Sequence, residues 1–331
     1  MKIAIIGAGA MGSLLGFYLC ERAEVWLLDP WQAHVDAINA EGLRRELGGE
    51  LATRHPHATA DASAIGPCDF ALVLVKAAQT GWAAEQARQL LRTGQQEPGP
   101  ETLISHDDML TAELSALGTG TVVVTLQNGV GNREQLAAAL GGGRVGQGVT
   151  ALGATLLGPG QVRHAGQGAT IFGAAPSRPA MRALAELFGA CGLPAELADD
   201  LDALVWGKLV VNVGINALTA LLRVPNGALA ELPAARELLA AAVAEAAAVA
   251  RARGTALPYA DPLAHVLTVA QATAANRSSM LQDVLRGSPT EIATINGAVV
   301  REGARLGVPT PVNQALALLV QALDASPAAR I

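Results

Sequence analysis

Residues 2–12 read KIAIIGAGAMG, an apolar run that leads directly into glycines at positions 7, 9 and 12. Residues 2–6 are β-type and a helical pattern begins soon after them, so the glycines lie in a strand-to-helix turn. There the first glycine allows the tight turn, the second lets a pyrophosphate approach the backbone, and the third lets helix and strand pack closely. Glycines that serve only a tight turn would give the same pattern. We predict a dinucleotide phosphate site formed by Gly7, Gly9, Ala10, Met11 and Gly12.

The end of the second predicted strand, residues 24–28, bears on the choice of dinucleotide. Asp29 follows this strand, 17 residues after Gly12, where an acid accepts hydrogen bonds from the adenine-ribose diol. No Lys or Arg lies between Arg22 and Arg44, so nothing local would neutralise a ribose 2′-phosphate. These residues favour NAD(H) over NADP(H). The alternative for Asp29 is an exposed helix-capping role.

The wider pattern predicts two domains in this chain of 331 residues. β-type runs at 2–6, 24–28 and 70–75 each precede a helix candidate, which is typical of a parallel sheet. Further strands are expected at 121–126 and 144–149, and antiparallel strands or a ribbon within the Gly-rich stretch 153–173. Long helices are expected at 199–222, 234–253, 262–286 and 289–306. The predicted fold is α/β, a Rossmann-type dinucleotide-binding domain over residues 1–198 followed by an all-helical catalytic domain over 199–331.

Composition and charge exclude several functional classes. The net charge of −6 comes without any run of Lys or Arg, so we expect no nucleic-acid partner. The three cysteines, Cys20, Cys68 and Cys191, have neither disulfide-framework nor metal-ligand spacing, so we expect reduced thiols, no metal site and a cytoplasmic protein. The glycines of residues 7–16 argue against a signal peptide, and no other apolar stretch is long enough to predict a membrane span.

One connection in the first domain is longer than its topology needs. About forty residues separate Thr80 from Thr121, whereas a crossover with one helix needs a dozen or more. The stretch GQQEPGP, residues 94–100, predicts an exposed loop. We expect this insertion to lie away from the chemistry. The alternative is that it leads towards Asn128 and reshapes one wall of a site there.

A polar stripe marks the predicted helix 199–222. Lys208, Asn212 and Asn216 are spaced i, i+4 and i+8, on one face of a strongly apolar segment. Burying three polar groups costs free energy unless they have partners, which makes them candidates for a functional site. The alternative is a lysine that reaches solvent and asparagines bonded within the fold.

Other candidate residues lie at strand ends and near helix starts. Lys76 and Asn128 each follow a predicted strand at the carboxyl edge of the sheet, where open α/β folds bind ligands. Asn276 and Ser279 are expected at i and i+3 of one helix. Glu291 also fits a capping box with Ser288, in which Pro289 occupies the first helical position. In that alternative the role of Glu291 is structural.

The motifs, taken together, resemble the 2-dehydropantoate 2-reductase (ketopantoate reductase) family over nearly the whole chain. They are GAGAMG at 7–12, VKAAQT at 75–80, QNGVG at 127–131, WGKLVVNVGINALTALLRVPNG at 206–227, NRSSMLQD at 276–283 and PTEIATINGAVV at 289–300. The resemblance implies reduction of the ketone of 2-dehydropantoate to (R)-pantoate in pantothenate synthesis, usually with NADPH. It implies catalysis by Lys208 with Glu291 binding substrate. It also implies a substrate cleft lined by Asn128, Asn212, Asn216, Asn276, Ser279 and Lys76, with Lys76 and Asn128 also facing the cofactor.

The resemblance is incomplete at two places. Asp29-Pro30 stands where the family commonly has a basic residue, and the 80–121 connection is unusually long. A related 2- or 3-hydroxyacid or opine-type dehydrogenase would share the fold and take another small keto acid. A nicotinamide-binding sensor without catalysis would need no polar constellation in the second domain. Apolar, Ala-rich helices are compatible with a homodimer, and a small 2-keto acid is the expected partner.

Overall fold

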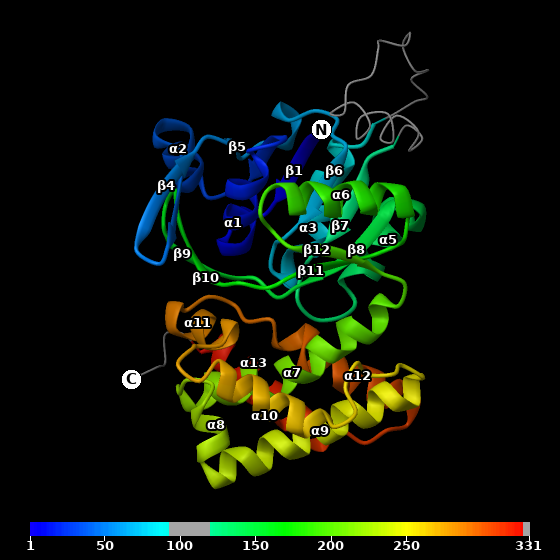
Figure 1. Cartoon of the computed structure of the whole chain (residues 1–331). Helices are drawn as coiled ribbons and strands as arrows, with labels where there is room; N and C mark the ends of the chain where they lie inside the picture. The colour runs from blue at the N-terminus through cyan, green and yellow to red at the C-terminus, as the bar shows by residue number, and fades with distance from the viewer. Residues whose placement is uncertain (93–119, 327–331) are drawn as a thin grey trace. The chain divides into compact units, whose positions relative to one another are not determined.

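The structure is a computed structural model that describes residues 1–92 and 120–326 (Figure 1). It contains two compact units. Unit 1 comprises Met1–Gln127 and Asn132–Leu201, and unit 2 comprises Asn128–Gly131 and Asp202–Ile331. The four residues 128–131 therefore belong to unit 2, although unit 1 surrounds them in the sequence. The predicted loop at 94–100 lies outside the described residues.

Unit 1 is built on a sheet to which the described chain contributes eight strands, in the order β12-β11-β8-β7-β6-β1-β2-β5. Its strands are β1 (Lys2–Ile6), β2 (Glu24–Leu28), β5 (His57–Thr59), β6 (Phe70–Val73), β7 (Val122–Thr125), β8 (Val145–Thr150), β11 (Thr170–Gly173) and β12 (Ala195–Ala198). All neighbours pair in parallel except β8 with β11. The predicted parallel sheet and Rossmann-type fold are confirmed.

Helices cover both faces of this sheet, which explains why its central strands, such as β1, β6 and β7, are mostly apolar. Ile3 and Ile5 of β1 are buried in one cluster, with residues of α1 (Ala10–Leu19), α2 (Gln32–Glu41) and α6 (Arg178–Ala190). Ala4 and Ile6 point to the other face, with α3 (Thr80–Gln89) and α5 (Asn132–Leu140). The described residues of this unit also form three 3₁₀ turns: η1 (Ala62–Ala64), η2 (Ala77–Gln79) and η3 (Gly142–Arg144).

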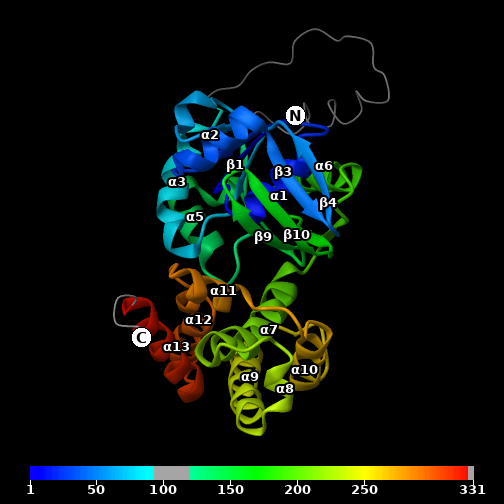
Figure 2. The same ribbon diagram turned by 90° about the vertical axis from the view of Figure 1, so that its left-hand side faces the viewer.

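A second, smaller sheet lies against α1 (Figure 2). Its order is β4-β3-β10-β9, formed by β3 (Leu43–Leu47), β4 (Glu50–Arg54), β9 (Gly153–Gly158) and β10 (Gln161–Gly166). β9 and β10 pair antiparallel, as predicted for the Gly-rich stretch 153–173. The last strand of that stretch, β11, instead joins the large sheet.

The described residues of unit 2 form helices joined by turns and contain no strand, as the sequence predicts. It comprises α7 (Leu201–Leu222), α8 (Ala228–Glu231), α9 (Pro233–Arg253), α10 (Pro262–Ala272), α11 (Ser279–Arg286), η4 (Ile292–Thr294), α12 (Asn296–Leu306) and α13 (Pro311–Ala325). By length and composition α7 could cross a membrane, although Lys208, Asn212 and Asn216 interrupt its apolar sequence. However, 72% of its most apolar window is buried inside the protein. α7 is therefore the core helix of unit 2.

Close packing fixes α7 among its neighbours. A Cβ at Gly214 would lie 2.8 Å from Val243 of α9 and 2.9 Å from Val266 of α10, so glycine lets the three helices approach. Gly207 faces Pro258 in the same way, and its carbonyl accepts a hydrogen bond from the Tyr259 hydroxyl at 2.9 Å. Pro258 and Tyr259, which lie outside α7, thus fix the position of the helical turn that carries Lys208.

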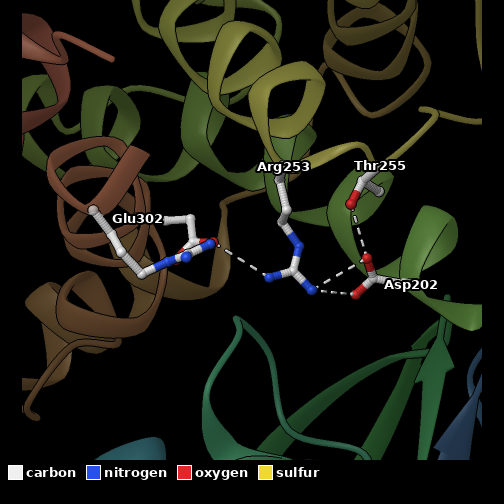
Figure 3. Close-up of polar contacts among 5 residues, drawn as sticks. Asp202, Arg253, Thr255 and Glu302 are labelled. Atoms are coloured by element: carbon white, nitrogen blue, oxygen red, sulfur yellow. Dashed lines mark hydrogen bonds and ion pairs between the residues drawn. The ribbon is translucent and has the colours of Figure 1, made fainter. Parts of the chain in front are cut away.

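An ionic network fixes the beginning of the same helix (Figure 3). Arg253 donates to Asp202 at 3.2 Å and to Glu302 at 3.4 Å, and Thr255 donates to Asp202 at 2.8 Å. The Arg253 guanidinium also lies 5.4 Å from the centre of the Trp206 ring. These contacts join α7, the end of α9 and α12.

Two of the predicted helices are wrong in extent. The expected helix 262–286 is interrupted, because α10 ends at Ala272 and α11 begins at Ser279. Between them, the carbonyls of Ala274 and Asn276 accept hydrogen bonds from the backbone of Gly227 and Asn226, a distant segment that local patterns cannot anticipate.

The expected helix 289–306 begins only at Asn296. Thr290 is held outside the helix by Asp324 of α13, which accepts from its hydroxyl at 2.6 Å and from its amide at 3.2 Å. The predicted capping box is wrong, since no helix begins at Ser288: its amide donates to the Asp283 carbonyl at 2.9 Å, and Glu291 precedes a 3₁₀ turn. Tertiary contacts override the local helix-start signal here.

Candidate active site

The glycine turn of unit 1 has the shape that a dinucleotide phosphate requires. Gly7 has φ +99°, and a Cβ on it would lie 2.7 Å from the Val75 amide, while a Cβ on Gly12 would overlap the Gly7 carbonyl oxygen. A Cβ on Gly9 would meet nothing within 4 Å, and no side chain caps the helix that begins at Ala10. An open cradle beside amides at a helix N-terminus therefore fits a pyrophosphate.

Asp29 lies beside this cradle. One of its oxygens accepts a hydrogen bond from the Ala8 amide at 2.8 Å, and the other accepts from the Trp31 amide at 2.9 Å. A carboxylate oxygen can accept a second hydrogen bond, so each keeps capacity for a hydroxyl. The carboxylate is thus fixed in place and still able to bind a ribose diol.

The carboxyl edge of the sheet carries Lys76, which is half-buried just after β6. A residue that we did not single out from the sequence fixes the backbone here. Gln127 donates from Nε2 to the Val75 carbonyl at 3.0 Å and to the Thr80 hydroxyl at 2.9 Å. Its position directly after a strand, before Asn128, was the available signal.

Two predicted residues that lie far apart in the sequence meet in unit 2. Asn128 donates from Nδ2 to Oε2 of Glu291 at 3.2 Å, across 163 positions of sequence. Gly129 makes this possible, since its φ is +83° and a Cβ there would overlap the Thr294 carbonyl. Glu291 is buried with 7% exposure, so its carboxylate is held in a protected position.

Lys208 interacts with the same carboxylate. Burial lowers the pKa of the Lys208 ammonium from 10.5 to about 8, and the negative charge of Glu291 opposes part of this decrease. A lysine with that pKa is protonated near neutral pH and can still release its proton. The amine can therefore act as a general acid.

The other two residues of the predicted polar stripe follow Lys208 along α7. Asn212 is half-buried and Asn216 is buried, on the same face by helical spacing. One turn later, the Thr219 hydroxyl donates at 2.7 Å to that of Ser278, which caps α11. This contact brings the start of α11 to the stripe of α7.

Asn276 and Ser279 are not on one helix, contrary to the prediction. Asn276 lies in the α10–α11 connection, and Ser279 is the first residue of α11. Both side chains are exposed. The buried Ser278 between them bonds Thr219, so this connection is anchored to α7.

Asn226 is a candidate that the sequence reasoning missed. It is 7% exposed, and its Nδ2 donates to the Thr273 hydroxyl at 2.9 Å. Within the described parts of the chain its Oδ1 is buried without a hydrogen-bond partner. Such an atom is costly to bury and is available to a ligand donor. The sequence signal was Pro225-Asn226-Gly227, which we interpreted only as a helix break.

Across residues 1–92 and 120–326, no group of three or more His, Cys, Asp or Glu side chains has an arrangement that would hold a metal ion. The cysteines in this part of the chain are free thiols. Burial raises the pKa of Cys20 to about 11 and that of Cys68 to about 12, so both remain protonated at neutral pH.

A dinucleotide cradle in unit 1 and a lysine–carboxylate–amide cluster in unit 2 define a two-domain, nicotinamide-dependent oxidoreductase. Comparison with known families identifies the family. The ketopantoate reductase PanE/ApbA sequence model matches residues 3–95 and 104–177, and the model of the C-terminal part matches 200–324. The chain belongs to the ketopantoate reductase PanE/ApbA family. Of the long connection, only residues 96–103 are unmatched, so the chain departs from the family less than we expected.

Individual relatives agree over the full length. A 2-dehydropantoate 2-reductase of Halobacterium salinarum is 34% identical over 97% of this chain and 98% of its own length. The solved PanE/ApbA family ketopantoate reductase of Ralstonia eutropha superposes with a TM-score of 0.83 at 32% identity, covering 99% of both chains. A D-mandelate dehydrogenase solved with NADH and anilino(oxo)acetate has the same TM-score and coverage at 28% identity. The chain is thus a reductase that uses a nicotinamide cofactor and a small keto acid.

Proposed function

We propose that the chain reduces 2-dehydropantoate to (R)-pantoate. The observation that carries this proposal is the cluster of Lys208, Glu291 and Asn128 in unit 2. When a ketone is reduced, negative charge develops on its oxygen, which therefore needs a hydrogen-bond and proton donor. A protonated lysine both stabilises that charge and gives the proton. When bound, the reduced nicotinamide supplies the hydride.

Each unit 2 residue has a role in this proposal. Lys208 donates a hydrogen bond and then its proton to the ketone oxygen. Glu291 accepts from a hydroxyl at the far end of the substrate, since a carboxylate beside an anionic substrate is otherwise repulsive. Asn128 holds Glu291 in place through its 3.2 Å hydrogen bond.

The remaining polar residues bind and orient the substrate. We assign the substrate carboxylate to Ser279 and Asn276, in the connection anchored to α7 through Ser278. Asn212 and Asn216 orient the substrate along α7. Asn226 accepts one further hydrogen bond at its unpaired Oδ1.

We propose NADH as the preferred cofactor. The phosphates bind over Gly7, Gly9, Ala10, Met11 and Gly12, with Lys76 and Asn128 also on the cofactor side. The Asp29 carboxylate supports NADH, since it is fixed by two amides and would repel a 2′-phosphate while bonding a free diol. The family resemblance implies NADPH instead, so a higher kcat/KM with NADPH would overturn this preference.

The test of the reaction is the decrease in absorbance at 340 nm with each cofactor and a panel of 2-keto acids. The panel includes 2-dehydropantoate and the 2-keto acid that corresponds to mandelate. Highest kcat/KM on 2-dehydropantoate supports the proposal. Highest kcat/KM on another keto acid would indicate a related dehydrogenase, and cofactor binding without turnover would indicate a sensor.

We also propose that the enzyme acts in the cytoplasm, without a nucleic-acid or membrane partner. The net charge of −6 and the burial of α7 support this. The homodimer suggested by the Ala-rich helices remains a prediction. Light scattering on the purified chain gives its molar mass and decides between one and two copies of 33.7 kDa.

A further inference from the structure

Trp31 is an unusual side chain for its place in unit 1. All four tryptophans lie in the described residues, and Trp31 has 43% of its surface exposed, whereas Trp26 and Trp82 are half-buried and Trp206 is buried. It stands two residues after Asp29, and its own amide donates to that carboxylate at 2.9 Å. An exposed indole directly beside the predicted ribose site therefore needs an explanation.

The Trp31 ring stacks on the ring of a buried histidine, His34. Its centre lies 5.3 Å from that of His34, with only 9° between the ring planes. His34 is fully buried, and its Nδ1 accepts from the Gly160 amide at 2.9 Å. The proton of the neutral ring must therefore be on Nε2, 3.1 Å from the Ser13 hydroxyl.

The same chain of hydrogen bonds reaches the glycine turn. The Ser13 hydroxyl donates to the Ala8 carbonyl at 2.7 Å, and the Ala8 amide donates to Asp29 at 2.8 Å. Trp31, His34 and Asp29 are thus fixed to the backbone that forms the phosphate cradle. His34 packs against one face of the Trp31 indole. The orientation of the indole is therefore fixed before any ligand binds.

We propose that Trp31 is the platform on which the adenine ring of the dinucleotide stacks. In a nucleoside the base is attached to the carbon next to the one that bears the 2′-hydroxyl. A ribose diol bonded to Asp29 therefore places adenine within reach of the indole. Stacking between a base and an aromatic ring needs a flat, exposed face, and His34 provides its rigidity. This inference rests on the proposed binding of a nicotinamide dinucleotide by unit 1.

Tryptophan fluorescence tests the platform without turnover. Titration of the wild type with ADP-ribose, which carries adenine, should quench its emission, and nicotinamide mononucleotide, which lacks adenine, should not. Trp31→Leu should abolish the quenching and raise the calorimetric Kd for ADP-ribose about tenfold, within the range for one stacked base. Trp31→Phe keeps an aromatic ring, so it should lose the quenching with a Kd within about threefold.

Trp26→Phe is the matched control. Trp26 lies on β2 and stacks on His57, 4.5 Å between ring centres, so its loss should leave both quenching and Kd unchanged. A wild-type Kd for ADP-ribose in Trp31→Leu, or a loss of quenching in Trp26→Phe instead, overturns the platform alone. A wild type that binds neither NADH nor NADPH by calorimetry overturns the proposed function and the platform with it.

Discussion

The ionisation of Lys208 gives the most direct test of the proposed chemistry. With a pKa of about 8, the ammonium is mostly protonated at pH 7 and about 1% protonated at pH 10. If the protonated form is the acid, kcat/KM for ketone reduction should fall roughly ninetyfold over this range. A lysine with the ordinary pKa of 10.5 would lose only about a quarter of its protonated form.

Two substitutions separate Lys208 from other titrating groups. Lys208→Arg keeps a positive charge that stays protonated throughout, so the decrease centred near pH 8 should disappear even though the maximal rate is lower. Glu291→Gln removes the charge that raises the Lys208 pKa, so the decrease should move below pH 8. Glu237→Gln, an exposed change on α9, should leave it in place.

The assay is steady-state kcat/KM for 2-dehydropantoate from pH 6 to 10, with melting temperature recorded at each pH. Lys208→Ala should lower turnover by roughly two or more orders of magnitude with cofactor binding nearly intact. A decrease near pH 8 that persists in Lys208→Arg would refute Lys208 as the acid. An unshifted profile in Glu291→Gln would refute the electrostatic coupling of the two residues.

Three further changes test the packing around the two candidate sites. Gly129→Ala should lower kcat/KM roughly a hundredfold, because the new Cβ would overlap the Thr294 carbonyl. Gly131 also has a positive φ but lies in open space, so Gly131→Ala should lower kcat/KM less than about threefold, and equal effects of the two substitutions would exclude the Thr294 contact as the cause. Burial lowers the pKa of His34 below 6.5, so the unfolded state binds more protons in acid than the folded state does. The unfolding free energy should therefore fall below pH 6.5, by at most about 1.4 kcal/mol per pH unit, and unfolding curves of His34→Gln should lack this pH dependence. Arg253→Ala should lower the unfolding free energy, measured by urea denaturation, by about 1–2 kcal/mol. Arg251→Ala, an exposed change on the same helix, should alter it by less than about 0.5 kcal/mol, and equal losses would mean that the Asp202 network does not contribute to stability.

Several features could be predicted because they depend on neighbouring residues. The strand 2–6, the glycine turn and the helix that carries Lys208 each follow from local periodicity and backbone requirements. The bounds of β1 and β2 agree with the prediction residue for residue. The assignments of individual site residues remain predictions, since they concern ligands.

Errors arose where the local signal was strong and a distant segment decided the outcome. Residues 273–278 have a helical pattern, yet the backbone of Asn226 and Gly227 bonds their carbonyls and interrupts the helix. Ser288, Pro289 and Glu291 satisfy the spacing of a capping box, yet Thr290 is held by Asp324 and the helix starts later. Hydrogen bonds to residues far along the chain outweigh a capping preference of about 1 kcal/mol.

The sequence by itself determined that a parallel α/β part precedes a helical part, that a glycine turn follows β1, and that α7 carries Lys208, Asn212 and Asn216 at helical spacing, because local periodicity and backbone requirements set each of these features. Only the tertiary structure decided that Asn128 meets Glu291, that Glu291 influences the Lys208 pKa, and that His34 supports Trp31. Spacing along the chain does not encode these pairs. They form when separate elements pack, and burial then gives their charges and hydrogen bonds an effect that they lack in the unfolded chain.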